Sequence, residues 1–195
     1  MKFELADKDI IRKKSLVIWC AVALTLVLDL FSKHLALVHL KAPDAPIELA
    51  GGKVIEIIPG FLNLRYAFNT GGAFSMMTDH VALLTVLAGC ALAILIFWVY
   101  TNSMRNPLVW LAFGMIIGGA IGNLGDRILR GGVVDFIDAC WRNYHWPTFN
   151  IADSAICVGM GFIVYFSIFL HEEKDVPEIN SKDSGKPSTQ PQSNQ

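Results

Sequence analysis

Four long stretches of the chain contain almost only apolar residues, and most of the polar residues lie between them. A helix needs about 20 mainly apolar residues to cross the hydrocarbon core of a bilayer, and each stretch meets this length. The stretches are Ser15–Leu37, Val81–Tyr100, Leu108–Leu129 and Ile151–Leu170. The pattern therefore predicts an all-α polytopic membrane protein with four transmembrane helices.

The segment between the first and second spans has a different period. In "FLNLRYAFN", residues 61–69, apolar side chains alternate with polar or small ones, as in a half-buried strand. The apolar positions are Leu62, Leu64, Tyr66 and Phe68. "KVIEII" precedes this run and is separated from it by a Pro-Gly turn signal, which favours a paired strand. We predict a small extracytoplasmic sheet over about residues 53–70, resting as a platform on the outer membrane surface.

The flanks of the spans suggest how the chain is divided and oriented. Basic residues favour the cytoplasmic side of a membrane, and Arg12, Lys13 and Lys14 come just before the first span. We therefore expect a cytoplasmic N-terminal segment over residues 1–14 and a membrane domain over residues 15–170. Residues 171–195 are rich in Ser, Pro, Gln, Lys and Glu, a composition typical of a disordered tail. An even number of spans places this tail in the cytoplasm.

Composition narrows the classes of protein and of site. Only 17% of the 195 residues are charged and the net charge is −1, so no general attraction to nucleic acid is expected. The four cysteines show no CxxC spacing, and three of them lie within spans, so neither a disulfide framework nor a metal site is indicated. The first span is too long for a cleaved signal peptide, and three more spans follow it.

Polar residues gather at one end of the predicted bundle. With the N-terminus inside, the first and third spans run outward and the fourth runs inward, which places these residues at the outer leaflet. They are Asp29, Lys33, Asn69, Asn123, Asp126, Arg127, Asp135, Asp138, Asn150 and Asp153. A charge within a membrane costs about 2.5–3.5 kcal/mol. Singly, each has a structural explanation: Lys33 can extend to the interface, and Asp29 can neutralise it at i, i+4 spacing. Their convergence favours a functional site.

Glycines in the third span indicate close helix packing near these residues. Gly114, Gly118 and Gly122 recur every four residues, a spacing that lets neighbouring helices approach closely. Asn123 follows this run and can form a hydrogen bond across the contact. Gly131, together with the next glycine, is expected to end the helix and turn the chain.

Two aspartates are candidates for acid–base chemistry. Asp135 lies among apolar residues in "GGVVDFIDAC", and Asp153 lies in the first turn of the fourth span. Two aspartates brought together in a shielded site share a proton, so one can activate water while the other protonates a peptide carbonyl. The helix N-terminus favours a negative charge on Asp153. Asn150 can cap that helix, hold the pair or hold the substrate.

Two other chemistries fit the sequence less well. A Ser/His/Asp triad would need a serine in a nucleophile-like turn, and the sequence offers none. A transporter could use the outer carboxylates as proton or cation sites. However, the polar groups do not cross the midplane, and the sequence shows no inverted repeat or broken helix.

The sequence resembles the bacterial lipoprotein signal peptidases, also called signal peptidase II, over about residues 15–170. The resemblance is strongest in "NTGGAFS" (69–75), "GGAIGNLGDRILRGGVVDFID" (118–138) and "FNIADSAI" (149–156), and weaker in "DLFSK" (29–33). Two positions depart from the usual pattern: Leu30 stands where many members have Gln, and Gly72 stands where Ala is usual.

The resemblance implies a membrane aspartyl endopeptidase of the bacterial inner membrane with no cofactor. It implies prolipoprotein substrates that already carry a diacylglyceryl group, cut just before the lipidated cysteine. Asp135 and Asp153 match the catalytic pair. Residues that match supporting or substrate-orienting positions are Asp29, Lys33, Asn69, Gly119, Asn123, Asp126, Arg127, Asn150 and Ala152. Asp126 is given a structural role in which it can pair with Arg127, and Asp138 is not made catalytic. The loop after the third span resembles a mobile flap, and we expect a monomer in contact with membrane lipids.

Overall fold

The computed structural model describes residues 2–71, 80–142 and 144–169, and for residues 2–7 it describes the backbone alone. The expected tail over residues 171–195 and most of "NTGGAFS" lie outside the described residues. Within the described ranges the chain forms long helices and one antiparallel sheet, in the order α1, β1, β2, α2, α3, β3, β4, α4.

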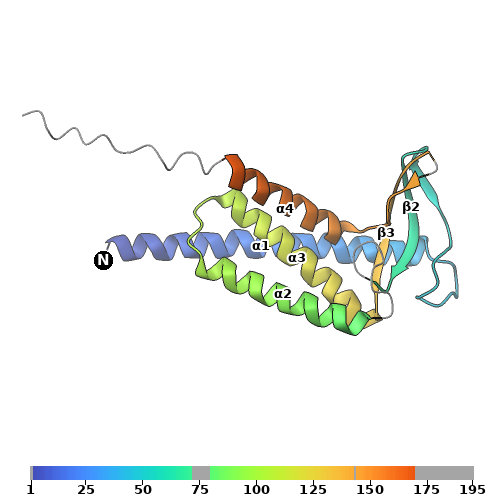
Figure 1. The fold of residues 1–195 in the computed structure, drawn as a ribbon, viewed down its shortest axis with the longest axis horizontal. Helices are drawn as coiled ribbons and strands as arrows, with labels where there is room; N and C mark the ends of the chain where they lie inside the picture. Colours follow the sequence, from blue (N-terminus) through green and yellow to red (C-terminus); the bar gives the residue numbers. More distant parts are fainter. Residues whose placement is uncertain (1, 72–79, 143, 170–195) are drawn as a thin grey trace, which may run out of the picture.

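The helices form a bundle whose axes run roughly side by side (Figure 1). Their bounds are α1 Lys2–His39, α2 Val81–Thr101, α3 Pro107–Arg130 and α4 Ile151–Phe169. All four are long and apolar enough to cross a membrane, and many large apolar side chains are exposed on their outer faces, as lipid contact requires. Figure 1 shows the sheet at the end of the bundle opposite the N-terminus. The predicted class, four spans with a small sheet, is confirmed.

Helix α3 lies at the centre of the bundle and packs against the other three helices. Its glycines allow this approach. A Cβ atom on Gly114 would lie 2.6 Å from the Cβ of Ala21, and one on Gly118 would lie 2.8 Å from the Cβ of Thr25. The small residues of the third span therefore form the contact between α3 and α1, as the four-residue spacing indicated.

Gly119 makes the corresponding contact with α4, and its replacement is expected to be destabilising. A Cβ atom there would lie 2.5 Å from the backbone oxygen of Ala152, so Gly119→Ala must push α3 and α4 apart, at a cost of about 1–3 kcal/mol. Gly125→Ala is the matched control because its Cβ would meet nothing within 4 Å. That variant should gain about 0.5–1 kcal/mol from better helix propensity. Thermal unfolding in detergent separates the two, and equal stability of both variants would contradict this packing.

The ends of α3 are fixed by local chemistry. Asn106 caps the start, where its side chain accepts a hydrogen bond of 2.9 Å from the backbone N–H of Leu108. Gly131 ends the helix with φ = 74°, a left-handed conformation that glycine adopts without strain. The chain then turns directly into the sheet, which sets the start of β3 beside the last turn of α3.

The sheet has the strand order β1-β2-β3-β4 and is antiparallel throughout. Its strands are β1 Ile55–Ile58, β2 Leu62–Asn69, β3 Val133–Trp141 and β4 Tyr144–His145. The pairing of β1 with β2 agrees with the predicted hairpin. The expectation of a loop after the third span is wrong for residues 133–141, which form an inner strand of the sheet. Val134 and Phe136 are buried there in a cluster with Tyr66 of β2 and with α1, and this burial holds the segment in place.

The pairing of β2 with β3 places each of two aspartates of β3 beside an asparagine of β2. Asp135 lies opposite Ala67 and Asp138 lies opposite Asn63, with a shift in register between the two positions. The shift is a bulge in β2, which has one residue more than β3 between these pairs. Nδ2 of Asn69 donates to Asp135, and Nδ2 of Asn63 donates to Asp138. The sheet therefore contributes two hydrogen-bonded carboxylates.

Candidate active site

A cavity of about 600 Å³ lies where the sheet meets the end of α3 and the start of α4. Asp135 and Asp153 both line it. The remaining lining comes from β2, β3, β4, α3, α4 and the segment before α4: Arg65, Ala67, Phe68, Asn69, Asn123, Arg127, Val133, His145, Trp146, Pro147, Thr148, Phe149, Ile156 and Cys157. The structure thus brings together the two aspartates that the sequence singled out.

Asp153 is held at the N-terminus of α4 by reciprocal hydrogen bonds with Asn150. The backbone N–H of Asp153 donates to Oδ1 of Asn150 at 2.9 Å, and the backbone N–H of Asn150 donates to Oδ2 of Asp153 at 3.2 Å. This is a capping box, in which two orphan donors of the helix start are satisfied together. Nδ2 of Asn123 donates to the other carboxylate oxygen at 2.7 Å. These hydrogen bonds fix the position of the Asp153 carboxyl group at the edge of the cavity.

Asp135 lies in a drier place on β3, where its exposed fraction is 2%. It accepts hydrogen bonds from Nδ2 of Asn150 at 2.7 Å and from Nδ2 of Asn69 at 3.2 Å. Burial, followed by the negative charge of Asp153, raises the pKa of Asp135 to about 7, although both hydrogen bonds act in the opposite direction. Burial on the sheet therefore favours the protonated form of Asp135.

Asn150 joins the two aspartates and is fully buried. Its backbone and Oδ1 hold Asp153, while its Nδ2 donates to Asp135. The same Nδ2 lies 3.1 Å from Oδ1 of Asn123 and 3.3 Å from the backbone oxygen of Val134. Two of the roles considered for Asn150, capping the helix and holding the pair, are thus both present in the structure.

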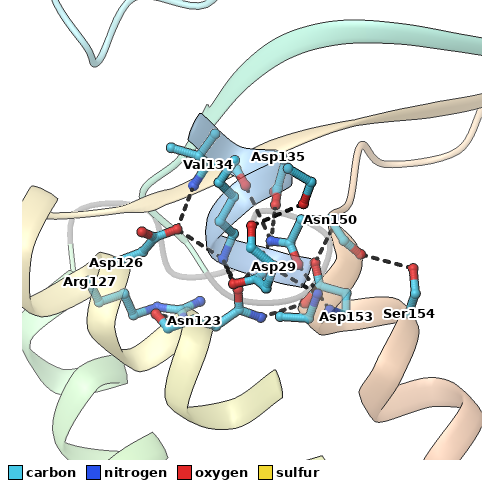
Figure 2. A network of polar contacts seen from close by, with 12 residues as sticks. Asp29, Asn123, Asp126, Arg127, Val134, Asp135, Asn150, Asp153 and Ser154 are labelled. Atoms are coloured by element: carbon cyan, nitrogen blue, oxygen red, sulfur yellow. Dashed lines mark hydrogen bonds and ion pairs between the residues drawn. The ribbon is translucent and has the colours of Figure 1, made fainter. Parts of the chain in front are cut away.

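A buried ionic network lies behind the asparagines (Figure 2). Nζ of Lys33 lies 2.8 Å from Oδ2 of Asp29 and 3.0 Å from Oδ2 of Asp126, and it donates to Oδ1 of Asn123 at 3.0 Å. The exposed fraction of Lys33 is 1%, so the suggestion that it extends to the interface is wrong. Lys33 instead fixes the orientation of the Asn123 amide, because its ammonium can only donate and must face the amide oxygen.

Asp126 pairs with Arg130 rather than with its neighbour Arg127. It also accepts a hydrogen bond of 3.3 Å from the backbone N–H of Val134. Residues four apart lie on the same face of a helix, whereas adjacent residues diverge, which explains the choice of partner. The guanidinium of Arg127 donates to the backbone oxygens of Asn123 at 3.3 Å and Gly71 at 3.1 Å. Arg127 thereby links α3 to the chain that follows β2.

Three further predicted positions join the helices beneath the site. The backbone N–H of Ala152 donates to Oδ1 of Asp29 at 3.0 Å, which ties the start of α4 to α1. Gly122 leaves room for the same carboxylate, because a Cβ atom there would lie 2.5 Å from Oδ2 of Asp29. Gly119 lies against Ala152, as described above. These residues set the spacing of the helices that carry the asparagines.

A second polar cluster on the sheet was not identified from the sequence. Oδ2 of Asp138 lies 3.4 Å from Nε of Arg65, and Oδ1 lies 2.9 Å from Nδ1 of His145. Nδ2 of Asn63 donates to the same carboxylate at 3.3 Å. The alternation of β2 places Arg65 on its polar face, but which residues meet it depends on the pairing of β3 with β2 and β4.

Within residues 2–71, 80–142 and 144–169, no group of three or more His, Cys, Asp or Glu side chains is arranged so that it could hold a metal ion. All four cysteines lie in the described ranges and are free thiols.

A membrane-spanning helical domain that brings two aspartates of different environment to one cavity is the arrangement of a membrane-bound aspartyl peptidase. Comparison with known proteins agrees with this class. The family model described as signal peptidase (SPase) II matches residues 21–169. The chain belongs to the signal peptidase II family and is a peptidase.

Individual relatives cover most of the chain. A lipoprotein signal peptidase of Actinobacillus succinogenes is 38% identical over 160 residues, which are 78% of this chain and 90% of the relative. One of Vibrio parahaemolyticus is 36% identical over 165 residues, with coverage of 82% and 93%. A solved structure described as a bacterial membrane enzyme aligns with a TM-score of 0.67 and 26% identity, covering 86% of this chain and 93% of that chain.

Proposed function

We propose that Asp135 and Asp153 are the catalytic pair with which this peptidase removes the signal peptide of prolipoproteins. The observation that carries the proposal is that both carboxyl groups line one cavity and are joined by Asn150. Asp135 is buried on β3, whereas Asp153 lies at the N-terminus of α4. General acid–base catalysis by two carboxyl groups requires such a difference in environment, so that one can act as the acid and the other as the base. In this proposal Asp153 is the base, and Asp135, whose pKa is raised to about 7, is the acid.

The reaction is a direct attack of water on the scissile peptide. Asp153 takes a proton from the water as the water oxygen bonds to the carbonyl carbon. Asp135 gives its own proton to the carbonyl oxygen. The C–N bond of the resulting diol then breaks while Asp153 passes its proton to the leaving nitrogen. The diol returns a proton to Asp135 as the carbonyl re-forms. The products are a peptide carboxyl group and a free amine, and both aspartates end as they began.

Asn123 and Asn150 support the different roles proposed for the two aspartates. Asn123 and the backbone N–H of Asn150 donate to Asp153, which stabilises its charge. Lys33 fixes the orientation of the Asn123 amide from behind. The network is formed before substrate arrives, so little reorganisation is needed during the reaction.

The raised pKa of Asp135 leads to a prediction for the pH profile. Since the acid must be protonated, kcat/KM should fall as the pH rises through about 7. The hydrogen bond from Asn69 lowers this pKa, so its loss in Asn69→Ala should move the alkaline limb to higher pH. A shift of about half a pH unit or more is expected for one hydrogen bond of about 1 kcal/mol. The pH profiles of wild type and variant measure it, and a limb that stays fixed or moves to lower pH would contradict the assignment.

We further propose that the substrates carry a diacylglyceryl group and are cut just before the lipidated cysteine. In support, the cavity is lined by Ile156 and Cys157 of α4, so it opens on a helix long enough to lie in the membrane. Purified protein in detergent should cleave a diacylglyceryl-modified precursor, seen as a gel shift, and leave the unmodified precursor intact. Equal cleavage of both precursors would refute the lipid requirement. No cleavage of either precursor would contradict the proposed reaction.

We propose that the membrane domain spans residues 15–170, with residues 1–14 and the tail over 171–195 in the cytoplasm. The catalytic pair and the sheet then lie toward the outer leaflet. The supporting observation is the basic flank at Arg12 and Lys13 before the first span. We propose a monomer surrounded by lipid. Reporter fusions at the C-terminus that are active only inside or only outside the cell test the orientation.

A further inference from the structure

The lining of the cavity differs in chemistry between helix α4 and the sheet. The α4 end is lined by Ile156 and Cys157, which follow Asp153 along a helix suited to a membrane. At the polar end, on the sheet side, the hydrogen-bonding side chains are Arg65 of β2, His145 of β4 and Thr148 in the segment before α4, accompanied by the apolar Trp146, Pro147 and Phe149. An elongated substrate bound to the proposed pair and extending from α4 to the sheet would therefore meet apolar groups of α4 on one side of the cut bond and these hydrogen-bonding groups on the other.

The donors at the polar end are held by a buried carboxylate. The side chain of Asp138 is 2% exposed and lies 3.4 Å from Nε of Arg65 and 2.9 Å from Nδ1 of His145. Thr148 holds the other side of the guanidinium, since Nη2 of Arg65 donates to its Oγ1 at 3.1 Å. Asp138 does not itself line the cavity. It orients two side chains that do, in the way that a carboxylate behind a histidine fixes its ring.

Both held side chains keep a free edge toward the cavity. The side chain of Arg65 is 42% exposed and that of His145 is 45% exposed. With Nδ1 of His145 directed at Asp138, its Nε2 is the ring nitrogen left for another partner. A guanidinium has five N–H donors and no acceptor, so this end suits carbonyl and carboxylate oxygens.

The direction of the substrate decides which segment meets these donors. The signal peptide of a membrane-bound precursor lies in the bilayer and must approach along the α4 end. The chain beyond the cut bond must then leave across the sheet, over Arg65 and His145. Resting on the proposed function, we infer that these two residues form a subsite for the segment after the lipidated cysteine and favour acidic over basic side chains there.

The test compares precursors that differ only in charge. Two diacylglyceryl-modified precursors carry either Asp or Lys at the second and third residues after the lipidated cysteine. The ratio of their kcat/KM values is measured for each enzyme, and it does not depend on how much of a variant is active. Wild type should prefer the acidic precursor by about three- to tenfold, a size typical of a partly exposed charge pair.

Arg65→Gln should bring this ratio close to one, and Arg65→Lys should restore part of it. Arg142→Gln is the matched control, because Arg142 is exposed, lies next to the β3 end and does not line the cavity. Its ratio should equal that of the wild type. A wild-type ratio near one, or an unchanged ratio in Arg65→Gln, would overturn the subsite while leaving the proposed function in place. Failure of the wild type to cleave either precursor would overturn the proposed function itself.

Discussion

Asp135→Asn and Asp153→Asn are each expected to lower the rate of prolipoprotein cleavage by at least about 1,000-fold. Removal of a positioned acid or base typically costs about 100- to 10,000-fold, and here neither role has a substitute. Asparagine keeps the size of the side chain but can neither take a proton from water nor supply one to the carbonyl oxygen. Initial rates on a lipid-modified precursor, at equal concentrations of folded protein, measure the loss.

Asp44→Asn serves as the matched control for these variants. Asp44 is exposed in the segment before β1 and has φ = 59°, a left-handed conformation that asparagine also tolerates. The same chemical change there should leave the rate within about twofold of wild type, as is usual for surface substitutions. If Asp135→Asn or Asp153→Asn keeps more than about a tenth of the wild-type rate, that aspartate is not a member of the pair.

Lys33→Met is expected to give the largest loss of stability, about 3–5 kcal/mol. The ammonium of Lys33 lies within ion-pair distance of Asp29 and Asp126, both almost fully buried. Removing one member of a buried ionic group leaves the other charges uncompensated in a medium of low dielectric constant. Methionine is similar in length, so the effect reports the lost charge rather than a cavity. Unfolding by heat or denaturant in detergent measures the change.

The control for this change is Lys53→Met. Lys53 is exposed just before β1, so the same substitution should alter the free energy of unfolding by no more than about 0.5 kcal/mol. Adding Asp29→Asn to Lys33→Met should recover part of the stability, because it removes one of the stranded charges. A loss below about 1 kcal/mol in Lys33→Met, or a further loss in the double variant, would contradict the role given to the network.

The helices and the first hairpin could be predicted because their signals are local. Twenty apolar residues in a row allow few structures other than a span, and the alternation around Tyr66 marks a strand with one buried face. Gly131 follows the last polar residues of α3, where a left-handed residue commonly ends a helix. None of these signals depends on what lies nearby in space.

The segment that forms strand β3 was expected to be a loop. Its run from Val133 to Ile137 mixes buried apolar residues with Asp135 and shows no alternation of polar and apolar side chains. The segment forms a strand because it pairs with β2 and because its apolar side chains pack in the cluster around Tyr66. Both are tertiary features, so the sequence of the segment alone could not indicate them.

The residues that gather at the candidate site could be predicted from the sequence, but the contacts among them could not. Topology placed Asp29, Asn123 and Asp153 at one end of the bundle, since helix direction decides the leaflet. It could not show that Lys33 faces Asn123, or that Asp126 selects Arg130, because those choices depend on the rotation of each helix about its axis. The cluster around Asp138 could not be predicted either, because it depends on the pairing of β3 with β2 and β4.

The most direct test is the mass spectrum of a complete reaction mixture of wild-type protein and diacylglyceryl-modified precursor in water enriched in oxygen-18. Direct attack of water predicts a signal peptide with one heavy oxygen in its new carboxyl group, a mature product that begins with the lipidated cysteine, and an enzyme of unchanged mass throughout. An enzyme whose mass rises transiently by that of the signal peptide would show a covalent intermediate. That result would contradict water activation by Asp135 and Asp153, and a cut at any other bond would contradict cleavage before the lipidated cysteine.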